Sequence, residues 1–342
     1  MSRYPEIDVA GSPYEMGRQI GEAARDQVRG FCEVGLARTQ KTVAVSTERA
    51  QQIAAACIPL AEAYAPHMMD ELRGVAESAG VTLTDLMMLQ VRNQFKPESD
   101  AGCTSFCLSQ EPTQMVVGQN WDNDPALDEF TIVLTRRPLD KPPLMTVTQA
   151  GLIAYIGLNS TGIGACLNTL PAPSREIGVP HYFTLREIYE QDSLDGAVRA
   201  IRRAARAIPA NIMLATPQGP ADLEITKDDV FVLRDPQRVT HTNHALHPEI
   251  VAVNDEFPEL IESYPRKQRI DELVDSQSSV EQCMDALRDH DGYPKSICRH
   301  ANEHPDNGYW TTVFSVVIEP HAGRMFVSRG TPCDHPYEAY SL

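Results

Sequence analysis

The sequence of 342 residues contains no apolar run approaching about 18 residues, so it predicts no membrane-spanning helix. Its N-terminus carries no apolar h-region, and we expect no signal peptide. Positive charge is scarce, with 30 Lys and Arg against 47 Asp and Glu and a net charge of −17. Because nucleic-acid-binding proteins need a basic face, this balance argues against a nucleic-acid partner.

Several common catalytic and binding motifs are also missing. The chain contains neither a G-x-G-x-x-G nor a G-x-x-x-x-G-K phosphate loop, and Ser105 lies outside any G-x-S-x-G elbow. The eight cysteines form no C-x-x-C pair and are scattered, several of them in apolar surroundings. We interpret them as free thiols of a cytoplasmic protein, and we expect no cofactor.

The first 102 residues are predicted to be helical after a short strand at 6–10. Ser12, Pro13 and Glu15 form a capping box that starts a first helix through residue 28. Further helices are expected at 46–64, with a kink or break at Pro59, at 66–79 and at 84–95. A loop at 97–102, suited to cleavage, precedes Cys103.

The pattern changes at Cys103, after which β-strands dominate. Strands are expected at 103–109, 115–121, 130–136, 144–149, 152–158, 163–169, 211–216, 221–226, 229–234 and 238–242, and in a closing hairpin at 311–319 and 324–329. Helices are expected at 182–191, 194–207, 266–275 and 279–289. Runs of strands interrupted by helical pairs favour antiparallel sheets with helices outside, and disfavour alternating βαβ units.

Cys103 is the leading candidate for catalysis, because it follows Gly102 and starts a strand. If the Gly102–Cys103 bond breaks, one residue carries both a thiol and a free α-amino group. An α-amino group titrates at about 7.7–8.0, so it can take the thiol proton near neutral pH, directly or through one water. The alternative is a buried structural cysteine, which is the commoner role of this residue type.

A series of motifs resembles the isopenicillin N acyltransferase family, a group of N-terminal-nucleophile hydrolases related more distantly to bile salt hydrolases and penicillin V acylases. The motifs are Gly11-Ser12-Pro13-Tyr14-Glu15-Met16-Gly17, Gly102-Cys103-Thr104, Gly118-Gln119-Asn120-Trp121-Asp122, Gly157-Leu158-Asn159-Ser160-Thr161-Gly162 with Leu167-Asn168, His241-Thr242-Asn243-His244, Ser296-Ile297-Cys298-Arg299 and Thr312-Val313-Phe314-Ser315. The resemblance implies an α+β fold, a four-layer αββα sandwich. It also implies self-cleavage into a helical pro-segment, 1–102, which stays bound as a small subunit, and a catalytic large subunit, 103–342.

The resemblance also assigns roles to individual residues. Cys103 would be the nucleophile, Asp122 would hold the new α-ammonium, and Asn243 would donate a hydrogen bond to the oxyanion. Asn168 is a second candidate donor. The alternative for Asp122 and Asn243 is an ordinary turn residue.

This sequence departs from the family pattern at two places. Gln119 stands where the bile salt hydrolase group has Arg, and Asn307-Gly308-Tyr309-Trp310 lacks the arginine that the acyltransferase branch has before its final hairpin. Arg266 is a candidate replacement cation, with a surface ion pair as the alternative. The weaker candidates for substrate binding are Thr104, Gln119, Asn120, Trp121, His244 and Arg266.

The predicted function is hydrolysis of a small N-acyl amide through an S-acyl-Cys103 intermediate. Transfer of an acyl group from an amide or thioester to an amine is the alternative, and a non-catalytic binding protein on the same fold is another. A zinc enzyme built on His241, His244 and His247 is a further hypothesis, but these residues lack a fourth ligand, and we expect no metal. The sequence leaves the substrate, the acyl chain length and a homo-oligomeric state open.

Overall fold

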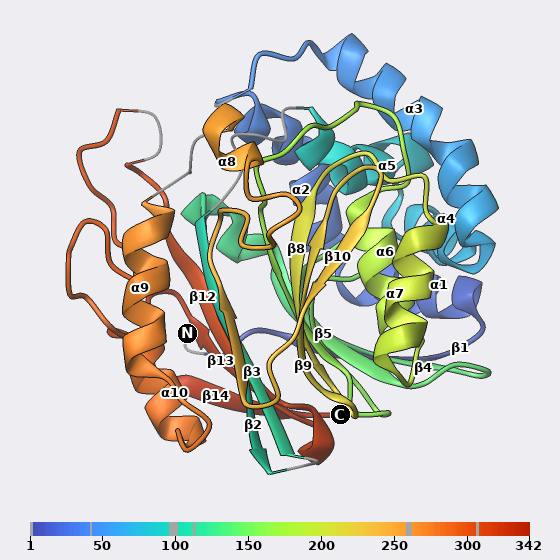
Figure 1. The fold of residues 1–342 in the computed structure, drawn as a ribbon. Helices are drawn as coiled ribbons and strands as arrows, with labels where there is room; N and C mark the ends of the chain where they lie inside the picture. The colour runs from blue at the N-terminus through green and yellow to red at the C-terminus, as the bar shows by residue number, and fades with distance from the viewer. Residues whose placement is uncertain (1–2, 42, 96–101, 112–113, 258–261, 306–307) are drawn as a thin grey trace.

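The computed structural model describes residues 3–41, 43–95, 102–111, 114–257, 262–305 and 308–342. Within these ranges the chain forms two β-sheets that lie face to face, with helices on the outer side of each (Figure 1). This arrangement confirms the predicted α+β class and the four-layer αββα sandwich. The loop predicted at 97–101 lies outside the described residues.

Five helices follow the first strand. They are α1 (Pro13–Ala23), α2 (Arg25–Thr39), α3 (Thr47–Tyr64), α4 (Pro66–Ala79) and α5 (Leu83–Val91), and a 3₁₀ turn spans Arg92–Gln94. The capping box at Ser12 is present, and Gly80 ends α4 in the left-handed region at φ 72°. The prediction of one helix through residue 28 is wrong, because the backbone leaves the helical region at Ala24 (φ −115°, ψ 29°). Helix α3 continues through Pro59, so the predicted break is also wrong.

The first sheet has eight strands in the order β1-β4-β5-β6-β7-β8-β9-β10. Their bounds are β1 Glu6–Gly11, β4 Thr131–Pro138, β5 Leu144–Gln149, β6 Ile156–Asn159, β7 Gly164–Asn168, β8 Ala210–Thr216, β9 Gly219–Ile225 and β10 Val230–Leu233. Strand β1 pairs with β4 in parallel, whereas the other neighbours are antiparallel. The N-terminal segment therefore contributes a strand as well as helices to the sandwich.

The second sheet has six strands in the order β11-β2-β3-β12-β13-β14. Their bounds are β2 Gly102–Glu111, β3 Gln114–Asn123, β11 Arg238–His241, β12 Thr311–Glu319, β13 Arg324–Arg329 and β14 Tyr337–Ser341. The predicted closing hairpin is β12–β13, and Gly323 adopts φ 62° at its turn. Strand β14 and the short helix α8 (Val253–Glu256) have no counterpart in the sequence prediction.

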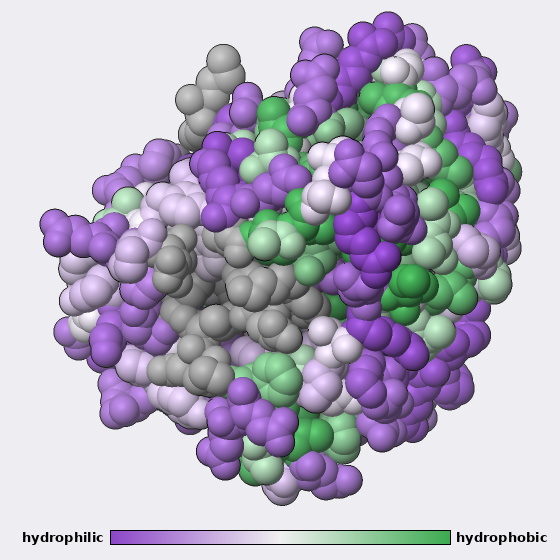
Figure 2. Space-filling view, turned by 90° about the horizontal axis from the view of Figure 1, so that it is seen from above, coloured by the Kyte–Doolittle hydropathy of each residue, from purple (hydrophilic) through white to green (hydrophobic). Residues whose placement is uncertain are grey.

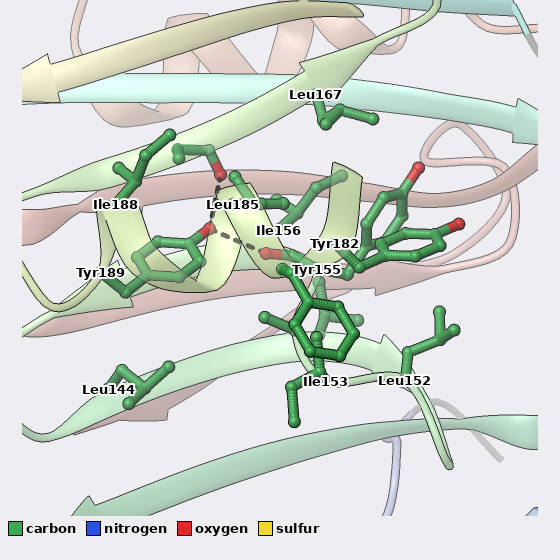
Figure 3. Close-up of a cluster of buried hydrophobic side chains, with 14 of the residues drawn as sticks. Leu144, Leu152, Ile153, Tyr155, Ile156, Leu167, Tyr182, Leu185, Ile188 and Tyr189 are labelled. Atoms are coloured by element: carbon green, nitrogen blue, oxygen red, sulfur yellow. Dashed lines mark hydrogen bonds between the residues drawn. The ribbon is translucent and has the colours of Figure 1, made fainter. Parts of the chain in front are cut away.

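Helices cover both outer faces, and apolar side chains fill the layers between. Helices α6 (His181–Ile188) and α7 (Leu194–Arg203) lie on the eight-stranded sheet, and α9 (Ser263–Leu273) and α10 (Val280–Leu287) lie on the six-stranded one (Figure 1). Figure 3 shows α6 packed against the sheet, where the Tyr189 hydroxyl donates to the carbonyl oxygens of Tyr155 at 2.8 Å and Ala165 at 3.2 Å. A smaller cluster that includes Phe106, Leu108, Ile270 and Leu287 fills the space under α9 and α10.

Hydrophilic residues cover much of the face in Figure 2, with hydrophobic residues in patches between them. Among the helices of the described residues, none combines the length and the hydrophobicity needed to cross a bilayer.

Candidate active site

Strands β2 and β3 lie side by side at the centre of the site. Cys103 pairs with Trp121, and Gly102 pairs with Asp122. Because successive side chains of a strand alternate between faces, Cys103 points into the layer between the sheets, while Thr104 and Asp122 point toward α9. Cys103 accordingly belongs to the main apolar cluster, and Phe106, which shares the face of Thr104, belongs to the cluster under α9.

The bond expected to be cut lies inside the strand. Gly102, predicted to be part of a loop, is the first residue of β2 and is buried. A buried strand end is a poor substrate for an external protease, because a protease needs extended, accessible backbone. Its position therefore favours a reaction within the chain over cleavage by another enzyme.

Asn243 contacts the backbone nitrogen of Cys103. It follows β11, which pairs with β2, and its Oδ1 accepts the Cys103 N–H at 2.9 Å. Its Nδ2 donates to the Thr169 carbonyl oxygen at 3.0 Å, and its own N–H donates to Ser263 Oγ at 2.7 Å. The side-chain oxygen of Asn243 is thereby directed at the nitrogen that cleavage would free.

Arg266, on α9, is buried with 1% of its surface exposed, so the surface ion pair considered from the sequence is wrong. One guanidinium nitrogen donates to the Cys103 carbonyl oxygen and, at 2.9 Å, to Thr104 Oγ1. The other donates to Asn243 Oδ1 at 2.8 Å. Burial lowers the pKa of Arg266, and the neighbouring Asp122 opposes that shift. The guanidinium thus links both sides of the Cys103 backbone.

The Cys103 thiol is buried, and its pKa is raised to about 12, mainly by burial and in addition by the charge of Asp122. Arg266 lowers that pKa through its charge, and hydrogen bonds from the Gln119 side chain and the Thr169 backbone lower it too. With the chain intact, the thiol is therefore a weak nucleophile near neutral pH.

Asp122 has one partnered carboxylate oxygen and one that lacks a partner. Oδ1 accepts from Thr312 Oγ1 at 2.7 Å, whereas Oδ2 is buried without a hydrogen-bond partner among the described residues. Burial raises the pKa of Asp122 to about 6, although Arg266, Thr312 and Arg299 act in the opposite direction. A buried oxygen without a donor is costly, and its position opposite Gly102 is suited to a new cation there.

Two of the remaining predicted residues have clear connections across the sheets. The Gln119 side chain exchanges two hydrogen bonds with the backbone of Leu167 on β7, at 2.7 and 2.9 Å. Asn168 donates to Ser105 Oγ and to the Thr242 carbonyl oxygen, both at 2.9 Å, so its amide supports the turn that carries Asn243. Neither amide hydrogen of Asn168 is directed at Cys103.

Among the described residues, the side chains of the other candidates, Asn120, Trp121 and His244, form no hydrogen bond with Cys103, although Trp121 is its partner on β3. Asn120 donates to the carbonyl oxygens of Leu287 and Ile297. Trp121 packs against Tyr155 and Phe314. His244 contacts Ser263 Oγ at 2.7 Å, and burial lowers its pKa to about 4. These contacts describe structural support, and a role in binding substrate stays a prediction.

Sequence reasoning missed Thr169, Ser263 and Thr312 as members of the site. Each contacts a predicted residue: Thr169 and Ser263 contact Asn243, and Thr312 contacts Asp122. Thr and Ser are common polar residues, so type alone offers no signal. Only the motif containing Thr312 pointed toward its segment.

The three histidines of the zinc hypothesis do not converge. His241 Nε2 faces Glu224 at 2.9 Å, and its Nδ1 faces the Thr242 carbonyl oxygen. His244 Nδ1 faces Ser263, and the His247 backbone N–H donates to Glu224. Their ring nitrogens therefore do not form one ligand set.

An open groove of about 790 Å³ passes close to Asp122. Its lining residues are Pro125, Asp128, His300, Ala301, Thr311, Thr312, Val313, Arg329, Gly330, Thr331 and His335. Thr312 both lines the groove and donates to Asp122, so a residue of the groove wall contacts the carboxylate.

Comparison with known proteins identifies relatives along most of the chain. The family model for acyl-coenzyme A:6-aminopenicillanic acid acyl-transferase matches residues 109–333. The chain is 28% identical over 349 aligned residues to the acyl-coenzyme A:6-aminopenicillanic-acid-acyltransferase 40 kDa form of Emericella nidulans, with 98% of this chain and 95% of the relative covered.

Two solved structures resemble the fold, each at 12% identity and a TM-score of 0.46. One is penicillin V acylase from Agrobacterium tumefaciens, with 66% of this chain and 83% of that chain covered. The other is a variant of conjugated bile acid hydrolase from Clostridium perfringens, with 70% and 97% covered.

Proposed function

This chain belongs to the acyl-coenzyme A:6-aminopenicillanic acid acyl-transferase family, and on that premise we propose that it activates itself by cleaving the Gly102–Cys103 bond. The mature enzyme then uses Cys103 as an N-terminal nucleophile. It attacks a small N-acyl amide, forms an S-acyl intermediate and passes the acyl group to water. Residues 1–102 and 103–342 become the small and large subunits.

The observation that carries the proposal is the environment of the Cys103 nitrogen. Asn243 Oδ1 accepts its single N–H, and the Asp122 oxygen without a partner lies at the ladder position opposite Gly102. An ammonium has three N–H donors in place of one. Asn243 and Asp122 together offer acceptors for the N–H groups that cleavage adds. The amide of the uncut chain has a single N–H, so it cannot bond to both acceptors.

The cleavage step is an N-to-S acyl shift. The Cys103 sulfur attacks the Gly102 carbonyl carbon, the C–N bond breaks, and the leaving nitrogen takes up the thiol proton. Water then hydrolyses the resulting thioester, which leaves a Gly102 carboxylate and a free Cys103 thiol. Gly102 has no side chain to obstruct the sulfur or to restrict the backbone during the shift.

In the mature enzyme the new α-amino group acts as the general base. It takes the thiol proton as sulfur attacks the substrate carbonyl carbon, and it gives that proton to the departing amine. Asn243 Nδ2 has one acceptor among the described residues, the Thr169 carbonyl oxygen, so its second hydrogen can stabilise the developing oxyanion. Hydrolysis of the S-acyl intermediate releases a carboxylic acid and regenerates the thiol.

The contacts of the 1–102 segment support its retention after cleavage. Strand β1 is hydrogen-bonded to β4 within the eight-stranded sheet. Glu71 of α4 is buried and forms ion pairs with Arg136 at 2.8 Å and Arg186 at 3.2 Å. Separating the segments would break these buried ion pairs and expose the surfaces that they join, which opposes dissociation.

Acyl transfer to an amine is the second candidate, because the matching family and the relative from Emericella nidulans are both named as acyltransferases. The two functions share the acyl-enzyme and differ only in the acceptor. We favour water because it needs no dedicated pocket. We also propose a reducing, cytoplasmic compartment, which the eight free cysteines support.

Intact-mass spectrometry and acyl-group partition test the proposal. Purified protein is expected to separate under denaturing conditions into two chains and to remain together in native size-exclusion chromatography. Incubation with a panel of N-acyl p-nitroanilides should give burst release of nitroaniline and a trapped acyl-enzyme mass on the large chain. If added amine diverts the product from acid to amide in a saturable manner, transfer replaces hydrolysis as the function. An uncut chain without acyl-enzyme overturns both.

A further inference from the structure

Two cysteines and two histidines converge near the surface, apart from the residues that contact Cys103, although one of them, His300, also lines the groove near Asp122. They are His290, Cys298, His300 and Cys333, and one ligand atom from each lies within 4.8 Å of every other. Cys298 is buried, His300 and Cys333 are half-buried, and His290 is exposed. No assigned role of the Cys103 site involves these four side chains.

The separations match those of a tetrahedral ion. The two sulfurs are 3.7 Å apart, the His300 Nε2 is 3.7 and 3.3 Å from them, and the two imidazole Nε2 atoms are 2.9 Å apart. With Zn–S near 2.3 Å and Zn–N near 2.0–2.1 Å, tetrahedral coordination requires about 3.8 Å between sulfurs, about 3.6 Å between sulfur and nitrogen and about 3.3 Å between nitrogens.

Hydrogen bonds alone do not explain why these four side chains lie so close together. His300 Nε2 faces His290 Nε2, Cys298 Sγ and Cys333 Sγ at the same time. A neutral imidazole nitrogen carries one proton or one lone pair, so it can serve one good partner, and the others remain close without a bond. A cation at the centre would satisfy all four atoms together.

We propose that His290, Cys298, His300 and Cys333 form a structural zinc site. Two thiolates and two imidazoles in tetrahedral positions are the ligand set that Zn²⁺ prefers. Four protein ligands leave no position for water or substrate, so the ion stabilises structure and takes no part in the Cys103 chemistry. Zinc replaces the thiol protons, so each coordinated cysteine releases one proton.

The surrounding backbone shows which segments the ion joins. The Cys298 N–H donates to the Asp289 carbonyl oxygen at 2.9 Å, which brings the segment after α10 beside Cys298. Arg288 Nε donates to the Pro332 carbonyl oxygen at 3.1 Å, which holds the turn that carries Cys333. The ion therefore crosslinks the segment after α10, the 298–300 segment and the turn after β13.

This crosslink lies next to the support of Asp122. The backbone of Arg299, between two ligands, accepts from the Thr312 N–H at 3.0 Å and donates to Thr312 Oγ1 at 3.0 Å. Thr312 Oγ1 in turn donates to Asp122. Loss of the ion should loosen this connection without removing any catalytic group.

The test is the metal content of the full-length protein, purified under reducing conditions without added metal and without an affinity tag containing histidine. Inductively coupled plasma mass spectrometry should find about one zinc ion per 342-residue protein. Protein depleted of metal and titrated with Co²⁺ should develop the visible bands of tetrahedral cobalt and a thiolate charge-transfer band, both saturating at one equivalent. Metal-free protein with no Co²⁺ spectrum overturns the proposal, as does a Cys298–Cys333 disulfide in the reduced preparation.

Variants assign the ligands. Cys333→Ser should weaken the charge-transfer band to about half, because one of two thiolates is lost, and His290→Ala should lower zinc affinity by at least about tenfold. Cys32→Ser, a half-buried cysteine on α2, is the matched control and should leave zinc content unchanged. Hydrogen exchange on the wild-type protein, with and without chelator, gives a measurement that needs no variant. Faster exchange at 290–300 and 331–335 is expected, and unchanged exchange there overturns the structural role.

Discussion

The backbone N–H of Cys103 donates a hydrogen bond of 2.9 Å to the Oδ1 of Asn243, 140 residues further along the chain. Arg266 donates to the same oxygen at 2.8 Å, so the orientation of the Asn243 amide is determined by two donors. The nitrogen of the predicted cleavage site is therefore held in position before any bond breaks.

Cys103→Ala should leave a single uncut chain. The wild-type protein should separate into chains of about 11 and about 27 kDa, by residue share of the 37.9 kDa total. Cys107→Ala, which removes a buried cysteine on the same face of β2, is the matched control and should still be cut. Intact-mass spectrometry distinguishes these outcomes. Cutting of Cys103→Ala at the same bond would show that another protease is responsible.

Asp122→Asn should stabilise the uncut Cys103→Ala protein at pH 7.5. The native pKa of Asp122 is raised from 3.8 to about 6, so the native state binds the proton more tightly than the unfolded chain. Stability from this group is therefore greatest below pH 4 and is lost as pH rises through 6. The expected gain is at most about 3 kcal/mol at pH 7.5, because the pKa is raised by about 2 units and each unit corresponds to about 1.4 kcal/mol, and it vanishes toward pH 4.

Chemical denaturation across this pH range measures the effect, with exposed Asp140→Asn in the same background as the control. In the cleaved enzyme the sign should reverse, because the Asp122 carboxylate then pairs with the α-ammonium. A stabilisation of equal size in both forms would contradict the pairing.

The acid limb of catalysis should move to lower pH in cleaved Asp122→Asn. The carboxylate favours the ammonium and raises the α-amino pKa, and the base is active only when it is deprotonated. Removing the carboxylate charge should shift the acid limb of the pH profile down by about 1 pH unit. The maximum rate should also fall, because Asp122 no longer holds the α-amino group in position. Profiles of kcat/KM against pH measure this shift. An unmoved limb in folded, processed protein argues against Asp122 as the partner of the amine.

Asn243→Ala should lower kcat by about 10²–10³-fold with little change in KM, because its hydrogen bond strengthens only as charge develops on the substrate oxygen. Asn243→Asp should be at least as impaired, since a carboxylate repels the oxyanion. Asn168→Ala should cost less, because its amide donates to Ser105 and Thr242. Rates are compared on protein confirmed as cleaved. An increase in KM alone would make Asn243 a substrate-binding residue.

Arg266→Met should raise the pKa of the Cys103 thiol, because the guanidinium charge lowers it in the native protein. Inactivation by iodoacetamide should then require higher pH, and kcat/KM should fall at least about tenfold. Arg266→Lys should keep the positive charge but lose the simultaneous hydrogen bonds to Cys103 and Asn243. Its activity should therefore lie between those of the wild type and Arg266→Met. Lys267→Met, on the same helix and paired with Asp271, is the control. An unchanged pH profile for Arg266→Met would exclude an electrostatic role.

Local patterns predicted most helices and strands well, because capping, periodicity and turn residues act over a few positions. The capping box at Ser12, the end of α4 at Gly80 and the β12–β13 turn were all correct. The errors have tertiary causes. Pro59 is tolerated within α3, and β14 forms by pairing with β13 although its own segment has no strong strand signal.

By itself, the sequence determined the change from helices to strands at Cys103, the candidate nucleophile and the family motifs, since each is written in contiguous residues. Only the tertiary structure decided that Arg266 is buried against Cys103 and that Asn168 supports the Asn243 turn. It also brought His290, Cys298, His300 and Cys333 together as the ligands of the proposed zinc site, whereas the evenly spaced histidines do not converge. The physical reason is that hydrogen bonds and coordination depend on separations of a few ångströms in space. Pairing of distant strands and packing of helices set those separations, and spacing along the chain does not.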